Sequence, residues 1–221
     1  MLVLHVPHAS TVIPVADRVD FCVDESALND ELLRLTDWYS DELYGKNFPD
    51  KQILRAPVSR LVVDVERFAL DAEEVCAKVG MGATYTMTAG GQTLRELQPA
   101  RRKELLDQYY WPHHQALDQL TGEMLALRGG CTILDAHTFP VVPLPTQIPM
   151  ANPPEIGIGT DPIHTLPELR ALAADFFQSR GFVVGLDLPF SGAMVPNAFY
   201  RKDTRVQSVM IEVAVISTWM R

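Results

Sequence analysis

Basic side chains are scarce in this sequence, and their scarcity limits which partners it can bind. The 221 residues include 19 Lys and Arg against 28 Asp and Glu, a formal net charge of −9 at pH 7. Because nucleic acids are bound through a basic surface that meets their phosphates, this balance argues against a nucleic acid as partner. A local pair of arginines can still bind a small anion, so a small-molecule partner is expected.

Cysteine is also rare, and long apolar runs are absent. Cys22, Cys76 and Cys131 form no CxxC pair, which favours reduced thiols over a disulfide framework. No apolar stretch approaches the roughly 18 residues of a membrane span, and the N-terminus carries no leader pattern. We therefore expect a soluble, cytoplasmic protein with no membrane partner.

Several nucleotide and nucleophile motifs are missing too. The sequence has no GxSxG elbow, no P-loop and no GxGxxG fingerprint. A serine hydrolase, an NTPase and a nucleotide-dependent dehydrogenase therefore lack support. The length fits a single domain over residues 1–221.

Strand-like and helix-like segments alternate along the chain, which predicts an α/β fold with a mostly parallel sheet. Strands are predicted at 2–8, 53–56, 61–64, 131–136, 182–185 and 206–213. Helices are predicted at 25–44, at 96–127 with a break at Pro112, and at 166–179. Residues 139–162 hold seven prolines and are predicted to be an irregular loop that covers or lines a site.

Two histidines, His8 and His137, come at the ends of apolar runs that are typical of buried strands. Ligands and catalytic groups collect at the carboxyl edge of α/β sheets. Because imidazole is the commonest side-chain metal ligand, the two histidines suggest a metal held after two neighbouring strands. The alternative is two unrelated strand-end histidines, one of them bonded to a backbone carbonyl.

Glu212 interrupts the last apolar strand, at a place where an ionised carboxylate is unfavourable unless it is paired or liganded. Next to a metal it is well placed as the general base for a water molecule. The alternative is a glutamate on an edge strand that faces solvent.

Arg60 and Arg67 flank the segment 61–64. Guanidinium groups bind planar carboxylates through two parallel hydrogen bonds, so this pair suits a substrate with one or two carboxylates. The structural alternative pairs Arg67 with Asp64 or Glu66, and Arg60 with a surface acid.

Three further residues are weaker candidates. Asp37, predicted on the first helix, could complete a site of two histidines and one acid, although a helical aspartate is exposed by default. His114, at the start of a helix, is expected to lie in the core or behind a ligand. Gly192 follows a strand in a turn that would let the backbone approach a ligand closely.

Together, these segments resemble the N-formylglutamate amidohydrolase family of histidine degradation, and they do so in sequence order over nearly the whole chain. The matching segments are 5–10, 36–37, 59–67, 110–114, 135–138, 159–161, 189–192 and 208–213. The family looks like a distant relative of zinc carboxypeptidases and aspartoacylase-type deacylases. The resemblance implies a phosphorylase/hydrolase-like three-layer α/β/α fold with a mixed, mainly parallel sheet. It matches His8 and His137 to metal ligands, Glu212 to the catalytic glutamate, and Arg67 to the arginine that holds the substrate carboxylate.

The third metal ligand departs from the carboxypeptidase pattern. Those enzymes take it from HxxE, but Thr11 stands three residues after His8. We expect Asp37 to supply it in preference to Asp135, which lies on the same strand face as His137 and could instead orient a ligand from behind.

Two other departures bear on the substrate. Glu66 occupies the asparagine position of the DxNR motif, and Ala214 and Val215 replace the Glu-x-Asn-Arg that often follows the catalytic strand. Both leave open whether formylglutamate itself is the substrate.

The resulting hypothesis is an amidohydrolase acting on a small, acidic N-acyl amino acid, with Zn²⁺ or another divalent metal on His8, Asp37 and His137. Glu212 acts as general base, and the metal or Arg60 stabilises the oxyanion. Arg67, Ser59 and Gly192 orient the substrate carboxylates. Two competitors are a peptidase or deacylase for larger acylated amines and a metal-free binding module for acidic metabolites. The oligomeric state stays open.

Overall fold

The computed structural model describes residues 1–143 and 150–215. In these ranges six strands form one sheet in the order β2-β1-β3-β6-β4-β5. Neighbouring strands are parallel except for β4 and β6, which are antiparallel, so the predicted mixed, mainly parallel sheet is confirmed. The strands are β1 (Leu2–Val6), β2 (Ile53–Arg55), β3 (Cys131–Pro140), β4 (Ile156–Gly159), β5 (Val184–Leu186) and β6 (Val206–Val215).

The helices lie between these strands in the sequence. They are α1 (Val15–Arg18), α2 (Glu25–Leu35), α3 (Ser40–Gly45), α4 (Pro99–Leu105), α5 (Trp111–Arg128) and α6 (Pro167–Gln178). A π-helical turn, Leu106–Tyr110, joins α4 to α5, and short 3-10 turns occur at Asp50–Gln52 and Val75–Val79. Across the described ranges, every helix is too short or too polar to cross a membrane.

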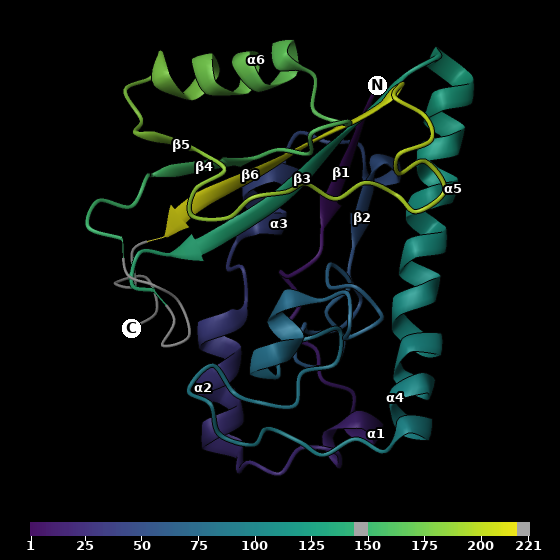
Figure 1. Ribbon diagram of the computed structural model, residues 1–221, viewed down its shortest axis with the longest axis vertical. Helices are drawn as coiled ribbons and strands as arrows, with labels where there is room; N and C mark the ends of the chain where they lie inside the picture. The colour runs from purple at the N-terminus through teal and green to yellow at the C-terminus, as the bar shows by residue number, and fades with distance from the viewer. Residues whose placement is uncertain (144–149, 216–221) are drawn as a thin grey trace.

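Helices cover both faces of the sheet (Figure 1). On one face α5 packs against Val3 and Ile133. On the other face, α6 packs on Ile158 of β4. Tyr44 of α3 packs on this same group of apolar side chains and also on the group around Leu4 of β1. Successive side chains of a strand point to opposite faces, so each strand contributes to both layers. The three-layer α/β/α architecture is confirmed.

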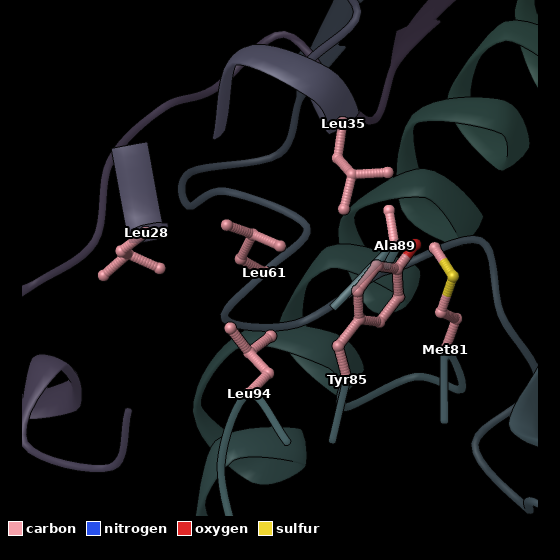
Figure 2. Packing of buried hydrophobic residues seen from close by; sticks show 7 residues of the cluster. All are labelled: Leu28, Leu35, Leu61, Met81, Tyr85, Ala89 and Leu94. Carbon is pink, nitrogen blue, oxygen red and sulfur yellow. The ribbon is translucent and has the colours of Figure 1, made fainter. Parts of the chain in front are cut away.

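A separate hydrophobic core holds the irregular segment 58–95 against α2. Leu28 and Leu35 of α2 face Leu61, Tyr85 and Leu94 in Figure 2. All five side chains are almost fully buried. This core therefore fixes the stretch of chain that carries both arginines of the predicted site.

Residues 61–64 do not form the predicted strand. They lie in a buried turn, and the guanidinium of Arg95 donates to the backbone carbonyls of Val62 and Tyr85. Hydrogen bonds from a buried side chain thus replace the strand-to-strand hydrogen bonds that these backbone carbonyls would otherwise accept.

The predicted helix 25–44 was also wrong in its extent. It ends at Leu35, and α3 begins only at Ser40, because Tyr39 adopts a left-handed backbone with φ of 64°. Asp37 consequently lies in the intervening turn, where its backbone N–H donates to the carbonyl of His8 at 3.0 Å.

The predicted irregular loop 139–162 was wrong at both ends. β3 continues through Pro140, and β4 occupies Ile156–Gly159 within the predicted loop. Residues 144–149 of that loop lie outside the described residues.

Candidate active site

The residues of the candidate site meet where β1, β3 and β6 lie side by side. His8 follows β1 by two residues, and β1 pairs with β3, which contains His137. Glu212 of β6 is the register partner of His137. All three line one cavity of about 690 Å³, together with Asp37 and Asp135 among others. The two histidines thus belong to neighbouring strands as predicted, but only His8 lies past the end of its strand, because His137 lies within β3.

His8 is buried, and its two ring nitrogens have different surroundings. Nε2 donates a hydrogen bond to Oδ1 of Asp64 at 2.9 Å. Nδ1 has no hydrogen-bond partner among the described residues, and it lies 3.7 Å from Oδ2 of Asp37 and 3.6 Å from Oε2 of Glu66. Burial and Arg60 lower the pKa of His8, but the carboxylates of Asp64 and Glu66 outweigh them and leave that pKa raised.

His137 is surrounded by carboxylates. Nδ1 donates to Oδ2 of Asp37 at 2.8 Å, and Nε2 lies 3.2 Å from Oε1 of Glu66 and 3.3 Å from Oδ1 of Asp135. Burial lowers the pKa of His137, but Glu66 and Asp135 raise it far more, well above its usual value. The rings of His8 and His137 are 5.1 Å apart between centroids. Their surroundings favour a cation between or beside them.

The site contains more acid than base. Around the histidine pair, five carboxyl groups accompany the guanidinium groups of Arg60 and Arg67, and Arg34, Glu74 and Asp161 line the wider cavity. The five acids are Asp37, Asp64, Glu66, Asp135 and Glu212. Burial raises the pKa of Glu212 to about 8, the charges of Asp37 and Glu66 add to the shift, and His137 opposes it. So much buried negative charge is unfavourable without protons or a cation to balance it.

The two predicted arginines differ in how their donors are used. Arg60 binds Oδ2 of Asp64 through Nε at 3.1 Å and Nη2 at 2.8 Å, and Tyr85 donates to the same oxygen at 2.8 Å. Arg67 lines the same cavity, and its buried Nε lacks a hydrogen-bond partner within the described chain. Arg60 is thus held by a buried acid, whereas Nε of Arg67 makes no hydrogen bond to a described residue and lies 3.6 Å from Oδ2 of the same Asp64.

Glycines in β4 allow the segment 188–192 to reach the cavity. A Cβ built on Gly159 would lie 2.3 Å from the carbonyl oxygen of Gly192, and one on Gly157 would lie 2.8 Å from that of Leu188. Gly192 itself has φ of 95°, which favours glycine. Gly192 lines the cavity with Phe190, and the close approach of its backbone to a ligand stays a prediction.

A chain of buried histidines behind His137 was missed by sequence reasoning. His5 Nδ1 donates to Oδ1 of Asp135 at 2.8 Å, and His5 Nε2 lies 2.9 Å from Nε2 of His113. The other oxygen of Asp135 accepts the backbone N–H of Met194 at 2.8 Å. No local pattern marks these contacts, because residues 5 and 113 are 108 positions apart.

Two predicted residues stand apart from this centre. Ser59 is buried in a turn, where its hydroxyl accepts the N–H of Leu61, and it is not among the lining residues of the cavity. His114 does line the cavity, but its Nε2 hydrogen-bonds the carbonyl of Val65 at 2.9 Å. The neighbouring His113, rather than His114, joins the network behind the metal-ligand candidates.

The donor set fits a metal ion. Two groups of His, Asp and Glu have ligand atoms within 4.8 Å of one another in the described residues: His8 with Glu66 and His137, and His5 with Glu66 and Asp135. The buried Nδ1 of His8, which has no hydrogen-bond partner, points to the first group. Imidazole nitrogens with a carboxylate oxygen are typical ligands of catalytic zinc.

Fold and site together define an α/β protein with a buried, carboxylate-rich histidine centre whose donor set could hold a metal ion. The family model of N-formylglutamate amidohydrolase matches residues 1–216, and the chain belongs to that family. The family implies a hydrolase that acts on an amide of a small molecule. No curated protein sequence matches the chain.

Two solved structures are similar to the fold. One is N-formylglutamate amidohydrolase from Ralstonia eutropha JMP134, with a TM-score of 0.76 and 21% identity over 96% of this chain and 81% of the other. The second is a gene product from Agrobacterium tumefaciens, with a TM-score of 0.66 and 19% identity over 96% of this chain and 80% of the other. At such identities the likeness supports the fold.

Proposed function

We propose that this protein is a metal-dependent amidohydrolase that cleaves the N-formyl or N-acyl amide of a small, acidic amino acid. Water is added across the amide, so that R–CO–NH–R′ and H₂O give R–COO⁻ and ⁺H₃N–R′. The observation that carries this proposal is the buried Nδ1 of His8, which has no hydrogen-bond partner and lies beside His137 among carboxylates. Zinc is the expected ion. The activity is assigned to one domain over residues 1–221 in the cytoplasm, in keeping with its free cysteines.

We assign the ion to Nδ1 of His8, Oδ2 of Asp37 and Nδ1 of His137. Ligands about 2.0–2.1 Å from a tetrahedral ion lie about 3.4 Å from one another. Asp37 Oδ2 is 2.8 Å from one of these nitrogens and 3.7 Å from the other, which brackets that spacing. Each Nε2 then keeps a carboxylate behind it, Asp64 for His8 and Asp135 for His137, as metal-bound imidazoles usually do.

Glu66 is the competing third ligand. Its oxygens lie 3.6 Å from Nδ1 of His8 and 3.2 Å from Nε2 of His137. We prefer Asp37 because it is more deeply buried and its single oxygen lies near the same nitrogen of both rings. The choice between the two acids decides which ring nitrogen of His137 binds the ion.

A bound divalent ion supplies a Lewis acid that polarises the amide carbonyl and acidifies water. Glu212 takes the proton of the attacking water and returns it to the leaving amine. Positive charge beside Glu212 lowers its pKa from about 8 and so favours the carboxylate that this role needs. Arg67 offers its unpartnered Nε to the substrate carboxylate, and Gly192 lets the backbone approach the substrate. Arg60, bound to Asp64, contributes its charge to the cavity.

Metal analysis of the purified protein, coupled to a panel of N-formyl and N-acyl amino acids, tests this function. We expect about one zinc ion per chain, hydrolysis of at least one panel member, and loss of activity after chelation. Preferred cleavage of peptides would indicate a peptidase instead. Tight binding of dicarboxylates with no metal and no turnover, even after metal supplementation, would indicate a binding module.

A further inference from the structure

An apolar pocket adjoins the polar cavity and has no role in the chemistry above. It has a volume of about 370 Å³, and the described residues that line it are all apolar. Four of them, Phe139, Pro140, Pro189 and Phe190, also line the polar cavity. The two spaces therefore share a wall.

The position of the pocket along β3 relates it to the reacting centre. Phe139 is buried two residues after His137, so the two side chains point to the same face of the strand. The rings of Phe139 and Phe190 pack edge to face with centroids 6.0 Å apart. A group that leaves the histidine centre in this direction meets aromatic surface.

Arg67, the arginine assigned to the substrate carboxylate, is connected to the histidine pair through Asp64 and His8, whereas Phe139 follows His137 on β3. Arg67 Nε is 3.6 Å from Asp64, which accepts from His8, and His8 in turn faces His137. A substrate with its carboxylate at Arg67 and its amide at the histidine pair thus directs its acyl group towards Phe139.

We infer that the apolar pocket is an acyl subsite, and that the preferred substrates are N-acyl amino acids with an aliphatic or aromatic acyl group rather than a formyl group. This inference rests on the proposed function. An engineered apolar cavity of about 150 Å³ admits benzene, so about 370 Å³ has room for a ring or a short branched chain. A formyl group leaves such a pocket unfilled and loses about fourfold in binding for each methylene that is not buried.

The test compares the formyl, acetyl, hexanoyl and benzoyl derivatives of one amino acid, with the metal-loaded full chain. We expect kcat/KM for the hexanoyl and benzoyl compounds to exceed that for the formyl compound at least tenfold. Val141, which is 38% exposed, lines the pocket, whereas its neighbour Val142, which is 63% exposed, does not line it. Val141→Asp should remove most of that preference, whereas Val142→Asp, outside the pocket, should change neither the preference nor formyl turnover.

Equal or better turnover of the formyl compound by the wild-type chain would overturn the acyl subsite and leave the amidohydrolase function standing. So would equal losses on all four compounds in Val141→Asp. If no derivative is hydrolysed although metal is bound, the proposed function fails, and calorimetry with hexanoate and acetate then decides the pocket alone. Hexanoate binding at least tenfold tighter than acetate, and lost in Val141→Asp, supports the subsite; equal affinities overturn it.

Discussion

Nε2 of His5 lies 2.9 Å from Nε2 of His113, and the two rings form a buried chain that ends on Asp135 beside His137. Burial lowers the pKa of His113 to about 2, so this imidazole is neutral. Because His5 donates from Nδ1 to a carboxylate, its Nε2 is left to accept the Nε2 proton of His113. Asp135 thus sets the tautomer of His5, His113 occupies the other ring nitrogen, and the shared Asp135 links the pair to Nε2 of His137 at 3.3 Å.

Removing this donor should weaken both the fold and the reaction. We expect His113→Leu to lower the free energy of unfolding by about 1–3 kcal/mol, because a buried acceptor on His5 loses its partner. The variant should also lower kcat and metal affinity, as changes behind metal ligands do, by about 10- to 100-fold. His113→Gln, which keeps an N–H donor, should recover part of both. Equal metal affinity and equal kcat in wild type and His113→Leu would mean that the His5–His113 pair has only a structural role.

Metal content separates the two candidate third ligands. Asp37→Asn should lose most of the bound metal, because its Oδ2 lies near Nδ1 of both His8 and His137. Glu66→Gln should retain it. Inductively coupled plasma analysis after dialysis measures both, and Asp41→Asn, on the partly exposed surface of α3, serves as the matched control. The reverse result, with metal lost only in Glu66→Gln, would move the ion to Nε2 of His137.

Glu212 should matter for turnover and not for metal binding. Glu212→Gln keeps the size of the side chain but cannot take a proton from water, so we expect kcat to fall by about 10²- to 10⁴-fold at unchanged metal content. Glu123→Gln, an exposed change on α5, should be silent. Near-normal turnover in Glu212→Gln would remove this residue from the mechanism.

Arg67 should act mainly on substrate binding. Its buried, unpartnered Nε is the donor that we assign to the substrate carboxylate. Losing a hydrogen bond to a charged group amounts to about 1.5–3 kcal/mol, so Arg67→Met should lower kcat/KM by about 10- to 150-fold, mostly through KM. Arg128→Met, at the exposed end of α5, provides the control. A fall in kcat at constant KM would contradict the binding role.

Much of the fold could be predicted from the sequence because apolar strands and the helices between them differ in period. The errors fell where short apolar runs are ambiguous. Residues 61–64 have the composition of a strand, but a buried guanidinium satisfies their backbone as a turn. β4 was missed because its four residues, Ile156–Gly159, follow closely on two prolines.

Site residues could be predicted where a polar residue stands in or at the end of an apolar strand. They could not be predicted where the contact joins residues that are far apart in the sequence. His8, His137 and Glu212 stand out in their local runs, and the structure places all three on one cavity. The contact of His5 with His113 spans 108 residues, and no local pattern encodes it. The position of Glu66 beside the two histidines was likewise not predicted. The segment that carries Glu66 is held in place by the hydrophobic core packed against α2, and such tertiary packing leaves no local pattern.

The pH dependence of stability offers a last prediction, made for the metal-free protein between pH 6 and pH 5. Burial lowers the pKa of His114 to about 4, whereas an unfolded histidine titrates near 6.5. As the pH falls below 6.5, the unfolded state takes up a proton that the native His114 does not, so stability present at higher pH is lost.

The pKa of His113 is lowered to about 2, so His113 also makes the protein less stable as the pH falls. The histidines with raised pKa, His8 and His137, are protonated in both states across this window and do not contribute to the slope. Each histidine with a lowered pKa should therefore lower the free energy of unfolding by at most about 1.4 kcal/mol for each pH unit that the pH falls. Urea unfolding at pH 5 and pH 6 should give a slope smaller by about this amount in His114→Gln than in wild type. An identical slope in both proteins would mean that His114 is protonated in the native state.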